Sequence, residues 1–152
     1  MISIPFPYPA GEAERYVIRQ RSERDAGRSA TFAIEHKTEG GLCGLVEVRD
    51  IEREHSQAEL SFWLAAEVWG QGYMSEVVQA VVRYAFEVLC LNRLYAYHMV
   101  RNPASGRVLE KNGFTQEGLL RQRVRKWGQF EDVLQWAILR QDVGYLQTSE
   151  CV

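Results

Sequence analysis

The sequence predicts one mixed α/β domain in which an antiparallel meander of strands is followed by a parallel strand pair. Three observations indicate this fold class. Apolar residues alternate with polar ones over three successive segments in the first half of the chain. A long apolar helical segment then separates the third of these from another strand-like segment, as in a crossover between parallel strands. The 152 residues contain no linker, repeat or low-complexity stretch, so we expect a single domain over residues 1–152.

The first expected element is a helix over residues 12–25, because this segment is rich in helix-favouring residues and Gly27 follows as a C-terminal stop. A belt of Arg and Glu side chains is expected on its outer side. The side chains that we expect to face the core are Ala13, Tyr16, Val17 and Ile18.

Three strands are expected after this helix. Residues 29–36 alternate between apolar and polar side chains, and residues 38–41 form a turn with two glycines. Residues 42–49 form the second strand and residues 57–65 the third. Because the connections between them are short and polar, adjacent strands are expected to run antiparallel.

The second half of the chain begins with a strong helix from residue 74 or 75 to residue 90. A strand over residues 92–100 follows it, and Asn102-Pro103 is a favourable start for a short helix that ends at Gly113. Residues 114–140 are expected to form strands joined by a turn. The apolar face of the strong helix, which we expect to be buried, comprises Val77, Val78, Val81, Val82, Ala85, Val88 and Leu89.

Composition and charge argue against several classes of protein. The net charge is −2, whereas proteins held to nucleic acid or anionic lipid by charge carry a basic excess. The chain has neither an apolar run of about 18 residues for a membrane span nor the pattern of a secretory signal. The three cysteines and three histidines are scattered, which argues against a metal site. We therefore expect a cytoplasmic protein with no metal and no nucleic-acid or membrane partner.

The loop before the strong helix is the best local indication of a binding site. Gly70 and Gly72 precede a helix start, where unpaired backbone N–H groups and the helix dipole attract anions, and Ser75 adds a hydroxyl. A phosphate cradle and a plain turn that requires glycine explain this local pattern equally well. P-loop and dinucleotide motifs fit less well, because Tyr73 stands where the first requires Lys and Ser75 where the second requires Gly.

Three longer motifs resemble a known family. Residues 69–76 (WGQGYMSE), 101–105 (RNPAS) and 109–114 (LEKNGF) are similar, in order and spacing, to motifs of the GNAT superfamily of N-acetyltransferases. The similarity runs from about residue 7 to residue 142 and is greatest to the branch that acetylates N-terminal amines of ribosomal proteins, such as the ribosomal-protein-alanine N-acetyltransferases. The resemblance implies a GNAT-like acyl-CoA N-acyltransferase fold, in which the third strand and the later parallel strand splay apart.

The resemblance also implies that acetyl-CoA is the co-substrate. Its pyrophosphate would bind the glycine loop, and its pantetheine arm would enter the gap between the splayed strands and pair with backbone groups there. The residues implied in binding are Phe62, Trp63, Leu64, Trp69, Gly70, Gln71, Gly72, Tyr73, Met74, Ser75 and Asn102.

The chain departs from the family pattern in places. Trp69 stands where the family usually has Gln or Arg, and Met74 where it has Gly or Ala, but both positions act mainly through the backbone. Family members also usually begin with a strand and a helix before the segment that starts here. Because that piece normally completes the sheet edge, we expect an exposed edge, which a second copy of the chain can cover in a homodimer.

Two residues are candidates for catalysis. Acyl transfer requires a neutral amine, whereas a lysine-like amine with a pKa of about 10.4 is protonated at neutral pH. Glu59 is the candidate base, because some GNAT enzymes place a glutamate at this strand position. By resemblance Ser105 would protonate the leaving thiolate, since Leu109 stands where many members have a tyrosine. The alternatives are an ion pair or a solvated side chain for Glu59, and a structural place beside the helix cap Asn102 for Ser105.

These inferences favour an enzyme that moves an acetyl group from acetyl-CoA to a primary amine by direct attack. The acceptor stays open between a protein N-terminus, such as that of a ribosomal protein, and a small amine. Two other interpretations stay open at this point. One is a non-catalytic module that binds or senses CoA, and the other is an interaction protein that has lost cofactor binding.

Overall fold

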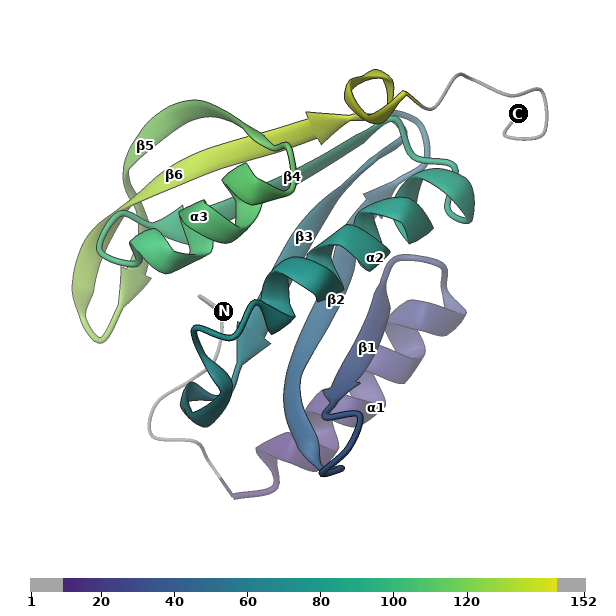
Figure 1. Ribbon diagram of the computed structural model, residues 1–152, viewed down its shortest axis with the longest axis vertical. Coiled ribbons are helices and arrows are strands. Elements are labelled where there is room, and N and C mark those ends of the chain that lie inside the picture. The colour runs from purple at the N-terminus through teal and green to yellow at the C-terminus, as the bar shows by residue number, and fades with distance from the viewer. Residues whose placement is uncertain (1–9, 145–152) are drawn as a thin grey trace.

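The computed structural model describes residues 10–144 (Figure 1). The order of its helices and strands is the one that the sequence predicts, with two short 3-10 helices added. The elements are α1 (Glu12–Asp25), β1 (Ala30–Glu35), β2 (Leu42–Glu52), β3 (Gln57–Leu64), η1 (Ala66–Val68), α2 (Tyr73–Glu87), β4 (Arg93–Met99), α3 (Pro103–Lys111), β5 (Thr115–Lys126), β6 (Gln129–Leu139) and η2 (Arg140–Val143).

Within the described residues, six strands form one sheet in the order β1-β2-β3-β4-β6-β5. The first three make the expected antiparallel meander. β3 and β4 run parallel, but they pair only where residues 57–59 lie beside residues 93–95. Beyond that point the two strands diverge, while β3 stays paired with β2 and β4 with β6. The mixed α/β class and the splayed parallel pair are therefore confirmed.

α2 and α3 cover one face of the sheet, and the hydrophobic core lies beneath them (Figure 1). Because strand residues alternate between faces, Val46, Val48 and Leu60 point into this core, where they are almost completely buried. Val78 and Phe86 of α2 are fully buried against them. Burial of side chains of this size contributes roughly 1.5–3 kcal/mol each. One hydrophobic core therefore holds both halves of the splayed sheet, the strands up to β3 and the strands from β4 on.

α1 lies against the other face of the sheet, and its inner side is polar. Its Gln20 accepts a hydrogen bond from Thr31 of β1 at 2.8 Å. Val17 and Ile18 are 46% and 67% exposed and no residue of α1 is buried, so the prediction that they face the core is wrong. The physical reason is that this face of β2 carries Glu47, which an apolar helix side would leave without a hydrogen-bond partner.

α2 ends at Glu87, before the predicted end at residue 90. The buried Arg140 donates hydrogen bonds to the carbonyl oxygens of Phe86 and Leu91, which suits a cation at a helix C-terminus. Cys90 then adopts a left-handed backbone with φ 56°, which ends the helical path. As a result Val88, predicted on the buried face, is 64% exposed.

Candidate active site

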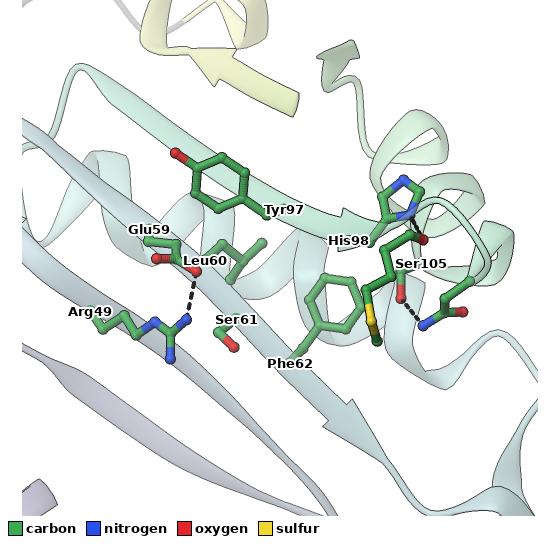
Figure 2. Close-up of a pocket in the computed structure, with 10 residues that line it drawn as sticks. Arg49, Glu59, Leu60, Ser61, Phe62, Tyr97, His98 and Ser105 are labelled. Carbon is green, nitrogen blue, oxygen red and sulfur yellow. Dashed lines mark hydrogen bonds and ion pairs between the residues drawn. The ribbon is translucent and has the colours of Figure 1, made fainter. Parts of the chain in front are cut away.

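The divergence of β3 and β4 leaves a cavity of about 40 Å³ at the splay (Figure 2). Four of the predicted site residues line it together: Glu59 and Phe62 from β3, and Asn102 and Ser105 from the start of α3. Elements that are far apart in the sequence therefore meet here. The described residues that line the cavity are Arg49, Glu59, Leu60, Ser61, Phe62, Tyr97, His98, Met99, Asn102 and Ser105.

One edge of β3 faces this gap. From Leu60 to Leu64, β3 pairs with β2 and with no other described strand, so the backbone groups of its second edge point toward the gap. The pairing with β2 is close, because a Cβ on Gly44 would lie 2.2 Å from the carbonyl oxygen of Trp63. An extended chain that enters the gap can therefore hydrogen-bond to the second edge as an added strand would.

Glu59 is held by an ion pair across the sheet. Arg49 lies opposite it on β2 and its Nη2 donates to the Glu59 Oε1 at 2.7 Å (Figure 2). The side chains of Arg49 and Glu59 are 25% and 14% exposed. The ion pair that the sequence left open is thus present, and it holds the carboxylate at the wall of the cavity in a fixed position.

Asn102 and Ser105 contact each other at the start of α3. Asn102 precedes the helix, but its side chain makes no capping hydrogen bond to the backbone. Its Nδ2 donates to the Ser105 Oγ at 3.1 Å instead (Figure 2). Asn102 is therefore not a side-chain cap in this structure, and both polar side chains are directed along the cavity wall.

Tyr97 is a site residue that the sequence reasoning missed. It lines the cavity from β4, on the side of the gap opposite Glu59 (Figure 2). Burial raises the pKa of its phenol, and the charge of Glu59 raises it further. Its neighbour Tyr95 pairs with Glu59 in the last parallel position, and burial raises the pKa of Tyr95 to about 12. The available signal was strand alternation, which places Tyr95 and Tyr97 on one face.

His98 also lines the cavity and was missed. It is only 4% exposed, and its Nδ1 lies 2.9 Å from the carbonyl oxygen of Met99. Because a carbonyl oxygen only accepts, Nδ1 carries a hydrogen. Nε2 lies against Gly106 of α3, where a Cβ would be 2.8 Å away. A small residue at position 106 was the only sequence signal of this contact.

The predicted loop is tied to the end of β3. The indole Nε1 of Trp69 donates to the carbonyl oxygen of Leu64 at 2.7 Å, while the ring stays 65% exposed. Gly70 and Gly72 have left-handed backbones with φ 73° and 80°, and a Cβ on either would meet no atom within 4 Å. Gln71 between them is exposed. The backbone of this loop is therefore open to a ligand.

The first residues of α2 have mixed surroundings. Met74 is buried in the core, whereas the hydroxyl of Tyr73 lies 3.1 Å from Nε2 of His36. The Ser75 hydroxyl accepts a hydrogen bond from Asn112 at 3.4 Å. Trp63, predicted to bind the pantetheine arm, is on the opposite face of β3 from Phe62 and is 37% exposed. Trp63, Leu64 and the loop residues border the gap without lining the cavity.

This arrangement fits a pyrophosphate carrying an extended arm. The N–H groups in the first turn of α2 have no partners within the helix, and the helix dipole adds partial positive charge there. Glycines before that turn let an anion approach the backbone closely. The contact between Trp69 and Leu64 places this helix start next to the gap edge of β3, so one extended ligand can reach both.

Comparison with known proteins identifies the family. A family model described as an acetyltransferase (GNAT) domain matches residues 1–115. The chain belongs to the GNAT acetyltransferase family. It is 38% identical over 137 residues to the Probable N-acetyltransferase YjcK of Bacillus subtilis (strain 168), which covers 89% of this chain and 76% of YjcK. The predicted GNAT membership is thus confirmed.

Other relatives and structures agree with this GNAT membership. The chain is 34% identical over 84 residues to the ribosomal-protein-serine acetyltransferase of Escherichia coli (strain K12), covering 55% of this chain and 47% of that protein. The structure of spermidine N-acetyltransferase from Vibrio cholerae in complex with CoA and spermine matches with a TM-score of 0.80 and 26% identity, over 95% of this chain and 82% of that one. The chain spans 57%, 64% and 65% of the length of three further Bacillus relatives.

Residues 10–144 show neither a metal-binding cluster nor a membrane-spanning helix. No group of three or more His, Cys, Asp or Glu residues there is arranged to hold a metal ion. No helix in the same range is long and apolar enough to cross a membrane.

Proposed function

We propose that this chain is an acetyl-CoA-dependent N-acetyltransferase, which moves an acetyl group onto a primary amine by direct attack. The observation that carries the proposal is the cavity at the splay, because it joins a fixed carboxylate, Glu59, to a gap that ends at the glycine loop. A site of this form supplies what acetyl transfer requires. It binds an extended donor along one strand edge and holds a base beside its reactive end.

The binding residues are assigned from the resemblance and from their positions here. The first turn of α2, with Gly70 and Gly72, would hold the pyrophosphate. Asn102 and the gap edge of β3, residues 62–64, would hold the pantetheine arm. Acetyl-CoA supplies an activated thioester when bound. The backbone N–H groups of the same edge are the natural donors for the oxyanion that forms in the reaction.

Glu59 is assigned as the base that takes a proton from the acceptor amine. Its partner Arg49 keeps the carboxylate oriented. A lysine-like or polyamine acceptor needs this help, because such amines are protonated at neutral pH. A peptide α-amine, with a pKa of about 7.7–8.0, needs less, so positioning supplies more of its rate. Ser105 is the residue that the resemblance assigns to the departing thiolate.

Two acceptor classes are supported by the names of related proteins, which include a ribosomal-protein-serine acetyltransferase and a spermidine acetyltransferase. We therefore place the acceptor among protein N-termini, including those of ribosomal proteins, and aliphatic amines. Because these relatives are named as enzymes, a sensing module or a pure interaction protein is the weaker interpretation. A cytoplasmic location and a homodimer closed over the edge of β1 complete the proposal.

Thermal unfolding with and without acetyl-CoA, followed by an assay of thiol release with a panel of amines, tests the function. At a concentration about 100 times Kd, binding adds roughly 2.7 kcal/mol, or about 5–10 °C for a domain of this size. We expect that shift together with amine-dependent thiol release. A shift without turnover on any amine would favour the sensing module. No shift at millimolar acetyl-CoA would contradict both and favour the interaction protein.

A further inference from the structure

The reaction proposed above ends with a thiolate that must receive a proton. Four side chains of the described cavity wall, besides the amide and the guanidinium, carry a hydrogen on oxygen or nitrogen: Ser61, Tyr97, His98 and Ser105. A free thiol has a pKa of about 8.5, so an effective acid has a pKa near or modestly above that value. The chemistry and the contacts of these four groups decide between them.

His98 is excluded by its hydrogen bond. Its Nδ1 donates to the carbonyl oxygen of Met99 at 2.9 Å, so the hydrogen on that nitrogen is already engaged. The other nitrogen, Nε2, is buried and makes no hydrogen bond to any described residue. It is also shut off from the cavity, because it lies against the backbone of Gly106.

The two serines are poor acids. An aliphatic hydroxyl holds its proton far more tightly than a phenol does, since its anion has no ring over which to spread the charge. The Ser105 Oγ accepts a hydrogen bond from the Asn102 side-chain amide at 3.1 Å, so this contact sets the position of the hydroxyl. Ser61 is 8% exposed and belongs to β3 itself.

Tyr97 meets the requirements. An unperturbed phenol has a pKa of about 10, the closest to a thiol among the four groups. Burial and the charge of Glu59 raise the pKa of Tyr97, which makes the phenol a weaker acid than an unperturbed one but keeps it protonated, and so able to donate, at neutral and mildly alkaline pH. Its position is fixed, because β4 is paired at this residue with Gln135 of β6 and the Arg123 guanidinium lies over its ring at 5.9 Å.

We propose that Tyr97 is the acid that protonates the departing thiolate, in place of the tyrosine that position 109 lacks. The inference rests on the proposed function. As the amine nitrogen bonds to the carbonyl carbon and the C–S bond breaks, the electron pair of that bond goes to sulfur. Tyr97 gives its phenolic proton to sulfur, and Glu59 takes the proton that the nitrogen loses. That proton returns to the phenolate directly or through water, so both residues end as they began.

The test compares two acetyl donors in the wild-type chain, Tyr97→Phe and Ser105→Ala. One donor is acetyl-CoA, and the other is an acetyl thioester of an aromatic thiol, whose thiolate leaves without an acid. With acetyl-CoA we expect Tyr97→Phe to lower kcat on the order of 100-fold and to change the KM for acetyl-CoA by less than about twofold. With the aromatic thioester, kcat/KM of the same variant returns to within a few-fold of the wild-type value.

Tyr95→Phe is the matched control, because Tyr95 lies on the same face of β4 but does not line the cavity. It should keep wild-type turnover with both donors. The assignment to Tyr97 would be overturned if Tyr97→Phe lost the same activity with both donors. It would also be overturned if Ser105→Ala, rather than Tyr97→Phe, lost activity with acetyl-CoA and kept it with the aromatic thioester. Either result would leave the acetyltransferase function intact. A wild-type chain that acetylates no amine would overturn both.

Discussion

Arg49 and Glu59 lie directly opposite each other on β2 and β3, and the guanidinium donates to the carboxylate at 2.7 Å. Both side chains are mostly buried. Because desolvation offsets much of the attraction in such a pair, the pair is weak evidence for stability. Its clear effect is geometric, since a carboxylate with a fixed partner can face the cavity in only one way.

Glu59→Gln should remove turnover and keep the fold. The amide still accepts a hydrogen bond from Arg49, but it cannot take a proton from the acceptor. We expect kcat to fall roughly 100-fold or more on a lysine-like amine, with little change in the KM for acetyl-CoA. Glu117→Gln is the control, because Glu117 is also paired with an arginine, Arg93 at 2.8 Å, and lies outside the cavity. Equal losses in the two variants would show that any lost ion pair impairs the enzyme.

Gly72→Val should abolish the stabilisation by acetyl-CoA. The valine side chain would fill the open side of the loop at the N-terminus of α2. Valine would also have to adopt the left-handed backbone of Gly72, which costs about 1–2 kcal/mol of folding free energy. Gly40→Val is the matched control, because Gly40 has φ 68° and equally open surroundings in the turn between β1 and β2. Excess acetyl-CoA should raise the unfolding temperature of Gly40→Val as much as that of the wild type, and should leave the unfolding temperature of Gly72→Val unchanged. Loss of the shift in both would point to strain alone.

The fold was predictable because its signals are local. Alternation over residues 57–65 and the apolar face of α2 each report burial within one element, and both agree with the structure except at Val88, which lies beyond the end of α2. The inner side of α1 was not predictable in this way. Val17 and Ile18 look like core residues in isolation, but the sheet face beneath α1 carries Glu47, and only tertiary structure brings those surfaces together.

The candidate site also has residues that the sequence could predict and residues that it could not. Asn102 and Ser105 were predicted because they belong to a recognisable motif, and Glu59 because some members of the family have a glutamate at its strand position; the structure brings the three to one cavity. Tyr97 and His98 were missed, because their place depends on where the pairing of β3 with β4 stops. That point is set by long-range packing rather than by neighbouring residues. The catalytic roles of Glu59 and Ser105 stay predictions until the variants are measured.

Gly106→Ala should destabilise the protein, and removal of His98 should relieve the effect. An added Cβ would lie 2.8 Å from Nε2 and 3.1 Å from Cε1 of His98, so α3 or the ring must shift. Overpacking of this kind costs about 1–3 kcal/mol. In a double-mutant cycle with His98→Ala, followed by urea unfolding, the cost of Gly106→Ala should shrink to within about 0.5 kcal/mol. Additive losses would mean that the ring and α3 do not compete for this space.

Glu47→Gln should make the protein more stable at neutral and alkaline pH. Burial raises the pKa of Glu47 above the usual 4.5, although Arg49 opposes this. A carboxyl whose pKa is higher in the folded state favours folding below the unfolded pKa, and this contribution is lost as pH rises through the folded value. Glutamine carries no charge to bury. Its advantage in urea unfolding should therefore be largest near pH 8 and shrink as the pH falls toward 4.5.

Glu23→Gln should change stability with pH in the opposite direction to Glu47→Gln, and it serves as the control for that pH dependence. The hydrogen bond from Arg28 lowers the pKa of Glu23, and Arg28 Nε lies 2.7 Å from the carboxylate. Its contribution is therefore present above the unfolded pKa and is lost as pH falls through the folded one. Glu23→Gln should be slightly less stable than the wild type at pH 7 and equal to it in acid. If Glu47→Gln instead followed the profile of Glu23→Gln, Glu47 would be a stabilised carboxylate and the polar contact beneath α1 would favour its charged form.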